Sequence, residues 1–237
     1  MPKYQKVKRL FSFNNLKILK SQKFGYEGVI LHLAPFNLSG WNVCPKASEG
    51  CIKGCLNTSG LGQLNSVQKS RINKTKYLRF DRQLFLEQLD KEISNGIIRA
   101  KKKNKIFCVR LNGTSDLSWE KFKVRDNKTL FELYPDTIFY DYSKNYHRFK
   151  NNLPKNYHIT FSLAEDNLDI AKQIIKETKR NVAVVFKKHL PKKFLGRNVL
   201  NGDIHDLRFL DKPNSIIGLR FKGNKKELEN NNFVINL

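Results

Sequence analysis

Three of the four cysteines lie within twelve residues of one another, in the stretch NVCPKASEGCIKGCLNTSGLGQ at 42–63. Six residues separate Cys44 from Cys51, and three separate Cys51 from Cys55. Thiolates are soft ligands that suit zinc and iron–sulfur clusters, and the glycines around them allow the tight turns that bring ligands together. Three cysteines on a four-iron cluster leave one iron free to bind a small molecule. We therefore predict a metal site with Cys44, Cys51 and Cys55 as its ligands.

The identity of the metal stays open at this level. A [4Fe-4S] cluster is the first interpretation, and zinc with Cys108 as a fourth ligand is the alternative. Cys108 belongs to a predicted strand, however, where a lone cysteine is usually a small core residue. A loop that binds no metal is the third interpretation. A disulfide framework is not indicated, because frameworks spread their cysteines along the chain.

A second polar cluster occurs in NGDIHDLRFLD at 201–211. His205 lies between Asp203 and Asp206 in the sequence, and neighbouring carboxylates would raise its pKa and suit a general base. The same residues would also suit a metal ligand set, or ion pairs that close the last strand–helix unit. We predict Asp203, His205 and Asp206 as catalytic residues, with structural ion pairs as the alternative.

The elements that must position these side chains alternate between strands and helices. Apolar, β-branched or aromatic runs predict six buried strands, at 28–35, 105–112, 137–143, 157–163, 182–186 and 215–221. Apolar residues at helical spacing occur between them, in RQLFLEQLDKEISNGIIRA and DNLDIAKQIIKETK. This alternation predicts an α/β protein with a parallel sheet, either open or curved into a partial barrel. The cysteine stretch then follows the first strand, at the carboxyl edge of the sheet where functional groups gather.

Polar residues also follow the second and third predicted strands. FYDYSKN ends the third strand and holds Asp141 in an aromatic run, where its carboxylate needs a partner or a ligand. A turn with Ser115 or Asp116 capping the next helix is one interpretation of RLNGTSDLSW, and a binding site is the other. This second motif places at a strand end Asn112, Gly113, Thr114, Ser115 and Asp116.

The 237 residues suffice for one sizeable core. We expect a single domain over 28–223, preceded by a basic N-terminal extension at 1–27 and followed by a polar C-terminal tail at 224–237. No apolar run approaches the roughly 20 residues of a membrane span, so we expect a cytoplasmic protein with no membrane partner. The oligomeric state is not indicated by any pattern.

Lys and Arg number 45 against 21 Asp and Glu, which gives a formal charge of +24 along the chain. Such a field favours polyanions, of which nucleic acid is the commonest; a solvated basic surface is the alternative. Basic and aromatic residues interleave in QKSRINKTKYLRFDR and KKHLPKKFLGR. There Tyr77, Phe80 or Phe194 would stack on bases if exposed, although a core position is favoured for Phe80.

A first strand followed by a three-cysteine loop resembles the layout of the radical S-adenosylmethionine superfamily. This resemblance implies a six-stranded parallel (β/α)6 partial barrel, similar to a TIM barrel, with a [4Fe-4S] cluster on the three cysteines. It also implies that the free iron binds S-adenosylmethionine and that the turn at 112–116 helps to hold it, and we group Asp141 with this cofactor site. The six-and-three spacing departs from the CxxxCxxC spacing usual in that superfamily.

A closer resemblance is to the bacteriophage "gene product 88" proteins, which carry a similar "CP.AS.GC...C" loop. The resemblance also includes the later motifs VRLNGTSD, FYDYSK, NGDIHDLRFLD and IIGLRFKG. It therefore extends over most of residues 28–223. For a phage-encoded chain, the expected cytoplasm is that of the host cell.

These features favour an iron–sulfur enzyme of radical S-adenosylmethionine type that modifies a nucleotide or nucleic acid. A non-catalytic nucleic-acid-binding protein, whose zinc or iron–sulfur site only orders the loop, is the alternative. A hydrolase or transferase centred on the 203–206 group is the third hypothesis.

Overall fold

A single mixed sheet forms the centre of the computed structural model, which describes residues 4–13, 16–223 and 231–237. Within these residues the sheet has nine strands in the order β1-β2-β3-β4-β5-β6-β9-β8-β7. The strands are β1 (Phe11–Ser12), β2 (Tyr26–Leu31), β3 (Ile106–Arg110), β4 (Ile138–Ser143), β5 (Tyr157–Ser162), β6 (Val182–Phe186), β7 (Lys193–Phe194), β8 (Arg197–Asn201) and β9 (Ile216–Arg220).

Seven α-helices and four short 3-10 helices connect the strands in the described part of the chain. The α-helices are α1 (Leu16–Gln22), α2 (Glu49–Lys53), α3 (Asn65–Phe80), α4 (Arg82–Lys102), α5 (Leu130–Leu133), α6 (His147–Lys150) and α7 (Leu168–Glu177). The 3-10 helices are η1 (Leu56–Thr58), η2 (Gly60–Gln63), η3 (Trp119–Lys121) and η4 (Arg208–Leu210). No helix among the described residues is long and apolar enough to cross a membrane.

Six parallel strands of the sheet lie side by side in chain order. Each of β2, β3, β4 and β5 pairs in parallel with the next, and β6 pairs in parallel with β9. These are the six strands expected from the apolar runs, so the α/β class and the parallel sheet are confirmed. Their carboxyl ends lie along one edge, because neighbouring parallel strands point the same way.

The expected TIM-barrel-like (β/α)6 shape is not confirmed, because the sheet is open. β1 extends one side antiparallel to β2. On the other side β8 pairs in parallel with β9, and β7 pairs antiparallel with β8. The two-residue strands β1 and β7 are too short to produce an alternating pattern in the sequence.

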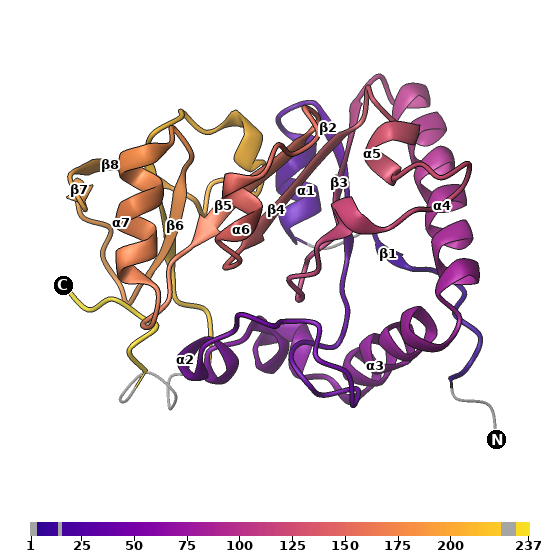
Figure 1. The fold of residues 1–237 in the computed structure, drawn as a ribbon, viewed down its shortest axis with the longest axis horizontal. Coiled ribbons are helices and arrows are strands. Elements are labelled where there is room, and N and C mark those ends of the chain that lie inside the picture. The colour runs from indigo at the N-terminus through magenta and orange to yellow at the C-terminus, as the bar shows by residue number, and fades with distance from the viewer. Residues whose placement is uncertain (1–3, 14–15, 224–230) are drawn as a thin grey trace.

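One face of the sheet carries the main apolar core beneath the long helices. α4 packs on β2 and β3, and α7 packs on β5. A methyl group on Gly96 of α4 would lie 2.3 Å from the ring of Phe107 in β3, so this glycine permits the close approach of helix and sheet. Figure 1 shows α4 and α7 at opposite sides of the molecule, with α2 and α3 together beneath the sheet.

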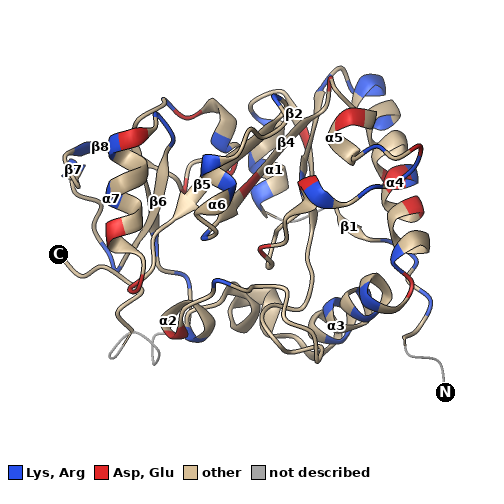
Figure 2. Cartoon of the chain, viewed as in Figure 1, with Lys and Arg blue, Asp and Glu red and all other residues tan. Residues whose placement is uncertain are grey.

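The opposite face of the sheet is covered by α1 and by the segment at 202–211. Side chains alternate along a strand, so Cys108 and Arg110 of β3 face away from the α4 side on which Phe107 lies. A smaller apolar cluster forms here from Cys108, Tyr140 and Leu207. Figure 2 shows Lys and Arg on elements of both layers rather than on one tail.

The two terminal segments pack on the domain where they are described. Of the expected extension at 1–27, residues 1–3 and 14–15 lie outside the described residues, and the remainder contains β1 and α1. Of the expected tail, residues 224–230 lie outside them as well. Beyond these, Ile235 pairs with Phe186 of β6, and Val234 is buried.

Candidate functional site

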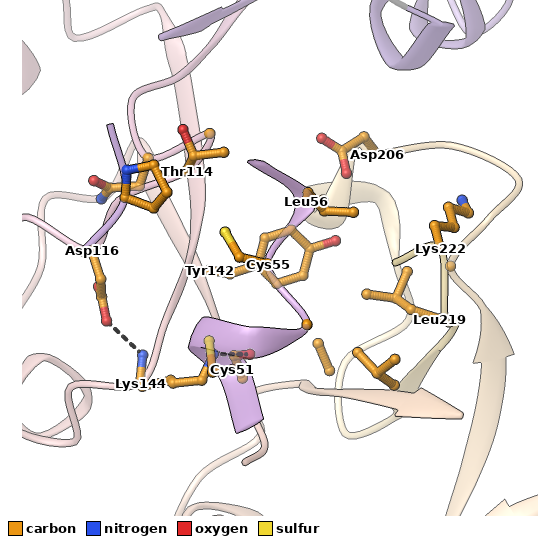
Figure 3. A pocket seen from close by; sticks show the side chains of 18 of the residues that line it. Cys51, Cys55, Leu56, Thr114, Asp116, Tyr142, Lys144, Asp206, Leu219 and Lys222 are labelled. Carbon is orange, nitrogen blue, oxygen red and sulfur yellow. Dashed lines mark hydrogen bonds between the residues drawn. The ribbon is translucent and has the colours of Figure 1, made fainter. Parts of the chain in front are cut away.

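A pocket of about 290 Å³ lies at the carboxyl edge of the parallel strands. Cys44, Cys51 and Cys55 line it, as do the whole turn at 112–116 and the three residues Asp203, His205 and Asp206. The structure therefore brings together every predicted site residue except Asp141, although their motifs are far apart in the sequence. Figure 3 shows Cys51 and Cys55 near the middle of the pocket in that view, with Asp116 on one side and Lys222 on the other.

The cysteine loop gains its shape from the short helix α2. Ser48 is its N-cap, and the Ser48 Oγ accepts a hydrogen bond from the Cys51 N–H at 3.2 Å. Gly54 ends the helix, and its N–H donates to the Gly50 carbonyl at 2.8 Å. Cys51 therefore lies within one helical turn, and Cys55 follows directly after it.

Two residues from distant parts of the chain hold α2 against the sheet. Glu165, after β5, accepts hydrogen bonds from the Gly50 N–H at 2.6 Å and the Ser48 hydroxyl at 2.7 Å. The buried Asn231 donates its side-chain amide to the Gly50 carbonyl at 3.1 Å. A methyl group on Gly50 would lie 2.5 Å from the Asn231 Oδ1, so only glycine fits at this position. These contacts fix where the thiols of the loop enter the pocket.

The thiols are suitable donors for a soft metal, but they are not in a coordinating arrangement. Among the described residues, no three His, Cys, Asp or Glu side chains are placed to hold a metal ion. Burial raises the pKa of Cys44 to about 12 and also raises the pKa of Cys55. The donor set fits an iron–sulfur cluster or zinc in kind, and binding would require the loop to draw the sulfurs together.

Cys108 is not part of this pocket. It is fully buried in the smaller apolar cluster with Tyr140 and Leu207, and burial raises the pKa of its thiol. The alternative in which Cys108 completes a four-cysteine zinc site stays a prediction, and it would require Cys108 to leave this cluster.

The turn at 112–116 is built around the buried side chain of Asn112. Its Oδ1 accepts hydrogen bonds from the Ser115 hydroxyl at 2.8 Å, the Leu117 N–H at 3.0 Å and the Trp119 indole N–H at 3.1 Å. Gly113 approaches β2 so closely that a methyl group would lie 2.6 Å from the His32 Nδ1. These contacts hold in place the turn at 112–116, all of whose residues line the pocket.

Neither Ser115 nor Asp116 caps a helix, which corrects that interpretation of the motif. The next helical turn, η3, begins after Ser118 without a side-chain cap. Asp116 instead accepts hydrogen bonds from the Lys144 N–H at 2.8 Å and from the buried Arg148 at 3.2 Å. This carboxylate ties the turn after β3 to the loop after β4.

Asp141 lies behind the turn rather than in the pocket. Its carboxylate is fully buried and accepts hydrogen bonds from the Asn112 N–H at 2.7 Å and the Tyr157 hydroxyl at 2.8 Å. Burial raises its pKa to about 7, although Arg110 and these hydrogen bonds act in the opposite direction. The partner that a strand-end carboxylate needs is thus supplied by the protein, and Asp141 positions the turn.

Asp206 joins two cations from different elements. It forms ion pairs with Arg110 of β3 at 2.7 Å and with Lys17 of α1 at 3.1 Å. The side chains of Arg110 and Asp206 are only 7% and 5% exposed, respectively. Burial acts to raise the pKa of Asp206, but Arg110 and Lys17 outweigh it and hold this pKa below its ordinary value.

The His205 ring lies between the Arg208 guanidinium and the Asp211 carboxylate, whose Oδ1 is 4.0 Å from the His205 Nε2. Asp203 pairs with Arg220 at 3.0 Å and with Lys222 at 2.7 Å, while the His205 Nδ1 lies 3.2 Å from the Arg208 guanidinium. Burial, followed by the charge of Arg208, lowers the pKa of His205. The expected rise of this pKa is therefore wrong, because burial and Arg208 outweigh the opposing effect of Asp206.

Several cations of the pocket were not singled out from the sequence. Of these, only Arg110 could have been identified from the sequence, because a charged residue inside the apolar run IFCVRLN must face a partner. The sequence does not distinguish the others, because exposed and pocket-facing basic residues look alike in a chain this basic; they are Lys17, Lys20, Arg220 and Lys222.

The aromatic residues of the two basic stretches differ in exposure. Tyr77 is buried and stacks on Tyr4 at 4.8 Å, and Phe194 packs edge-on against Phe186. Phe80 is 40% exposed with the Arg79 guanidinium 5.5 Å from its ring centre, so its expected core position is wrong. Phe80 is the most exposed of the three rings.

A family model described as "Gene product 88" matches residues 9–236. The chain belongs to the gene product 88 family. The family assignment drawn from the cysteine loop and the later motifs is therefore confirmed, and the match covers both the pocket and the terminal elements around it. No curated protein and no solved structure matches this gene product 88 protein.

Proposed function

We propose that this gene product 88 protein is an iron–sulfur enzyme of radical S-adenosylmethionine type that acts on a nucleotide or nucleic acid. The supporting observation is the convergence of the three-cysteine loop, the turn at 112–116 and the 203–206 group on one pocket. The strand-to-loop order agrees with that superfamily, since the cysteines follow the first of six parallel strands in chain order. The proposal includes a partial-barrel curvature of these strands and a place in the reducing cytoplasm of the host cell.

Within this proposal, Cys44, Cys51 and Cys55 hold a [4Fe-4S] cluster, and the turn at 112–116 orients S-adenosylmethionine beside it. A four-iron cluster with one free iron supplies an electron for reductive cleavage of a bound cofactor. Glu165 and Asn231 keep α2, and with it Cys51, in place.

The three residues of the 203–206 group have separate roles in this proposal. His205 is neutral at pH 7, because its pKa lies below the ordinary value, and a neutral imidazole can accept a proton from a substrate. Asp206 stays ionised and holds Arg110 and Lys17 at the pocket wall. Asp203 does the same for Arg220 and Lys222.

Anaerobic purification and metal analysis test this function. Brown protein with about four irons per chain is expected, with S-adenosylmethionine cleaved once a reductant is added. Cys51→Ala should lose the iron, whereas Cys108→Ala is the matched control and should keep it, because Cys108 lies outside the pocket. Colourless protein with one zinc per chain would sink the proposal.

A non-catalytic nucleic-acid-binding protein is the second candidate, favoured by the formal charge of +24 and by its spread over both layers (Figure 2). In that case the cysteine site only orders the loop. The affinity for DNA or RNA should then fall steeply with salt, because each phosphate contact releases condensed counterions. S-adenosylmethionine should not be cleaved under reductant, which separates the two candidates.

A further inference from the structure

The cations of the pocket gather on the side formed by α1, β9 and the 202–211 segment. We propose that this side is a subsite for a phosphate monoester, held by Lys17, Lys20 and Lys222, an inference that rests on the proposed function for the pocket's role as a substrate site. In the view of Figure 3, Lys222 and Leu219 lie across the pocket from Asp116 and Lys144, with Cys51 and Cys55 between them.

The pocket has an excess of positive charge. Its lining basic residues outnumber its lining acidic residues by three. The basic residues are Lys17, Lys20, Arg110, Lys144, Arg220 and Lys222, and the acidic ones are Asp116, Asp203 and Asp206. A concave wall focuses such a field, so the ligand that fits it best is an anion.

The carboxylates of the subsite fix the cations without neutralising them. Asp206 is shared by Arg110 and Lys17, and Asp203 is shared by Arg220 and Lys222. Each carboxylate therefore leaves one positive charge uncompensated.

Lys20 adds a further positive charge to the same wall. Its Nζ donates to the Asp203 backbone carbonyl at 2.6 Å, a neutral partner. The uncompensated positive charge of this wall matches the double negative charge of a phosphate monoester better than the single negative charge of a phosphodiester.

The charges around Lys17 agree with a site for an anion. Burial, together with the nearby charges of Arg110 and Lys222, lowers the pKa of Lys17 to about 8 against the opposing effect of Asp206. A bound dianion would reverse this by stabilising the charged ammonium group.

The rest of the pocket suits the body of a small ester. Ala183 and Val185 of β6 and Leu219 of β9 supply an apolar floor. The Tyr142 hydroxyl is buried and has no hydrogen-bond partner among the described residues, so it is available to a sugar or base.

Titration calorimetry on the anaerobically purified full chain tests the subsite. The probes are adenosine 5′-monophosphate, adenosine and inorganic phosphate. The monophosphate should bind about tenfold or more tightly than adenosine, since charge-assisted hydrogen bonds to the phosphate are lost in the nucleoside. Inorganic phosphate should compete with the monophosphate.

Two lysine variants and one control locate the contact. Lys20→Gln and Lys222→Gln should each lower the affinity for adenosine 5′-monophosphate about fivefold to tenfold and leave the affinity for adenosine unchanged. Lys23→Gln removes an exposed lysine that does not line the pocket and should change neither. Equal affinities for adenosine and its monophosphate would overturn the subsite, and so would an equal effect of the Lys23 variant.

An octanucleotide with and without a 5′-phosphate distinguishes the source of the phosphate. Preference for the phosphorylated strand over the mononucleotide assigns the monoester to a nucleic-acid end, and the reverse assigns it to a free nucleotide. Equal binding of both strands, tighter than the mononucleotide, overturns the subsite in favour of phosphodiester contacts. The iron content of the same samples separates the two proposals. Protein that contains iron but does not prefer the phosphorylated ligands would contradict only the subsite. Protein that binds them but contains no iron would contradict only the iron–sulfur cluster.

Discussion

Buried charges in this protein differ in whether the fold supplies an opposite charge. Asp206 has Arg110 within 2.7 Å, and its pKa is held below the ordinary value. Asp141 has only neutral hydrogen-bond donors in direct contact, and burial raises its pKa to about 7. The pKa values of these two aspartates are therefore shifted in opposite directions, because nearby cations compensate the desolvation of Asp206 but not that of Asp141.

The raised pKa of Asp141 predicts a loss of stability toward alkaline pH. A carboxyl group that binds its proton more tightly when folded contributes stability below the unfolded pKa of about 4, and this contribution is lost as pH rises through about 7. Relative to Asp141→Asn, the wild-type free energy of unfolding should fall by about 2–3 kcal/mol between pH 5 and pH 8. Urea unfolding followed by circular dichroism measures it.

Asp136→Asn is the matched control, since Asp136 is an exposed aspartate of the preceding turn. Its pH profile should run parallel to that of the wild type. Parallel profiles for the wild type and Asp141→Asn would show instead that the buried carboxyl does not titrate in this range.

The short helix α2 depends on contacts from outside itself. A helix of five residues has little stability of its own, and here Glu165 accepts two hydrogen bonds at its N-terminal end. The Asn231 amide donates to the Gly50 carbonyl within the helix. The loop that carries the thiols is therefore held by residues from β5 onward, and its conformation is a tertiary property.

Removing the Glu165 carboxylate should loosen α2 without unfolding the domain. Glu165→Ala removes two hydrogen bonds, worth about 1–2 kcal/mol of local stability at this exposed position. Trypsin cleavage after Lys53, followed by mass spectrometry, should become about tenfold faster. Asp166→Ala, at the exposed neighbouring position, should leave the rate unchanged; a wild-type rate in the Glu165 variant would show that the clamp is not needed.

Asp206 connects parts of the molecule that are far apart in the chain. It joins the 202–211 segment to α1 through Lys17 and to β3 through Arg110. These contacts lie on the sheet face opposite α4, where the apolar cluster is small. On this face, ion pairs therefore hold the covering segments to the sheet, whereas apolar packing does so on the α4 face.

Breaking this junction should be costly to the whole fold. Asp206→Ala leaves Arg110 buried without its partner, and the expected loss is about 3–5 kcal/mol in the free energy of unfolding. Because the pKa of Asp206 is lowered, its contribution is present above about pH 4 and is lost as pH falls through the folded value. Urea unfolding at pH 7 measures the loss.

Asp169→Ala removes a carboxylate that is 95% exposed and paired with Lys172. Its effect should stay below about 0.5 kcal/mol, as is usual for surface pairs. A similar small effect for Asp206→Ala would mean that Arg110 finds water or another partner when Asp206 is lost.

The six parallel strands were predictable because each is a short apolar run that must be buried, and α4 and α7 because their apolar residues recur at helical spacing. Strands β1, β7 and β8 were not predicted, since β1 and β7 have only two residues each and β8 holds just two apolar residues in RNVLN. Among the site residues, the cysteines and the turn at 112–116 follow from their place after a strand. The surroundings of His205 do not, because adjacency in the chain did not make Asp203 and Asp206 its partners.

The sequence alone determined the α/β class, the chain order of the parallel strands and the motifs that gather at their carboxyl ends. Local patterns of polarity and spacing are enough for these features, because burial is periodic within each element. Only the tertiary structure decided that Cys108 lies apart from the other thiols and that Asp141 supports the turn. It also decided that the lysines of α1 share one wall of the pocket with Lys222, which follows β9. Such outcomes depend on which distant side chains meet, and each charge acquires its partner only when the elements pack.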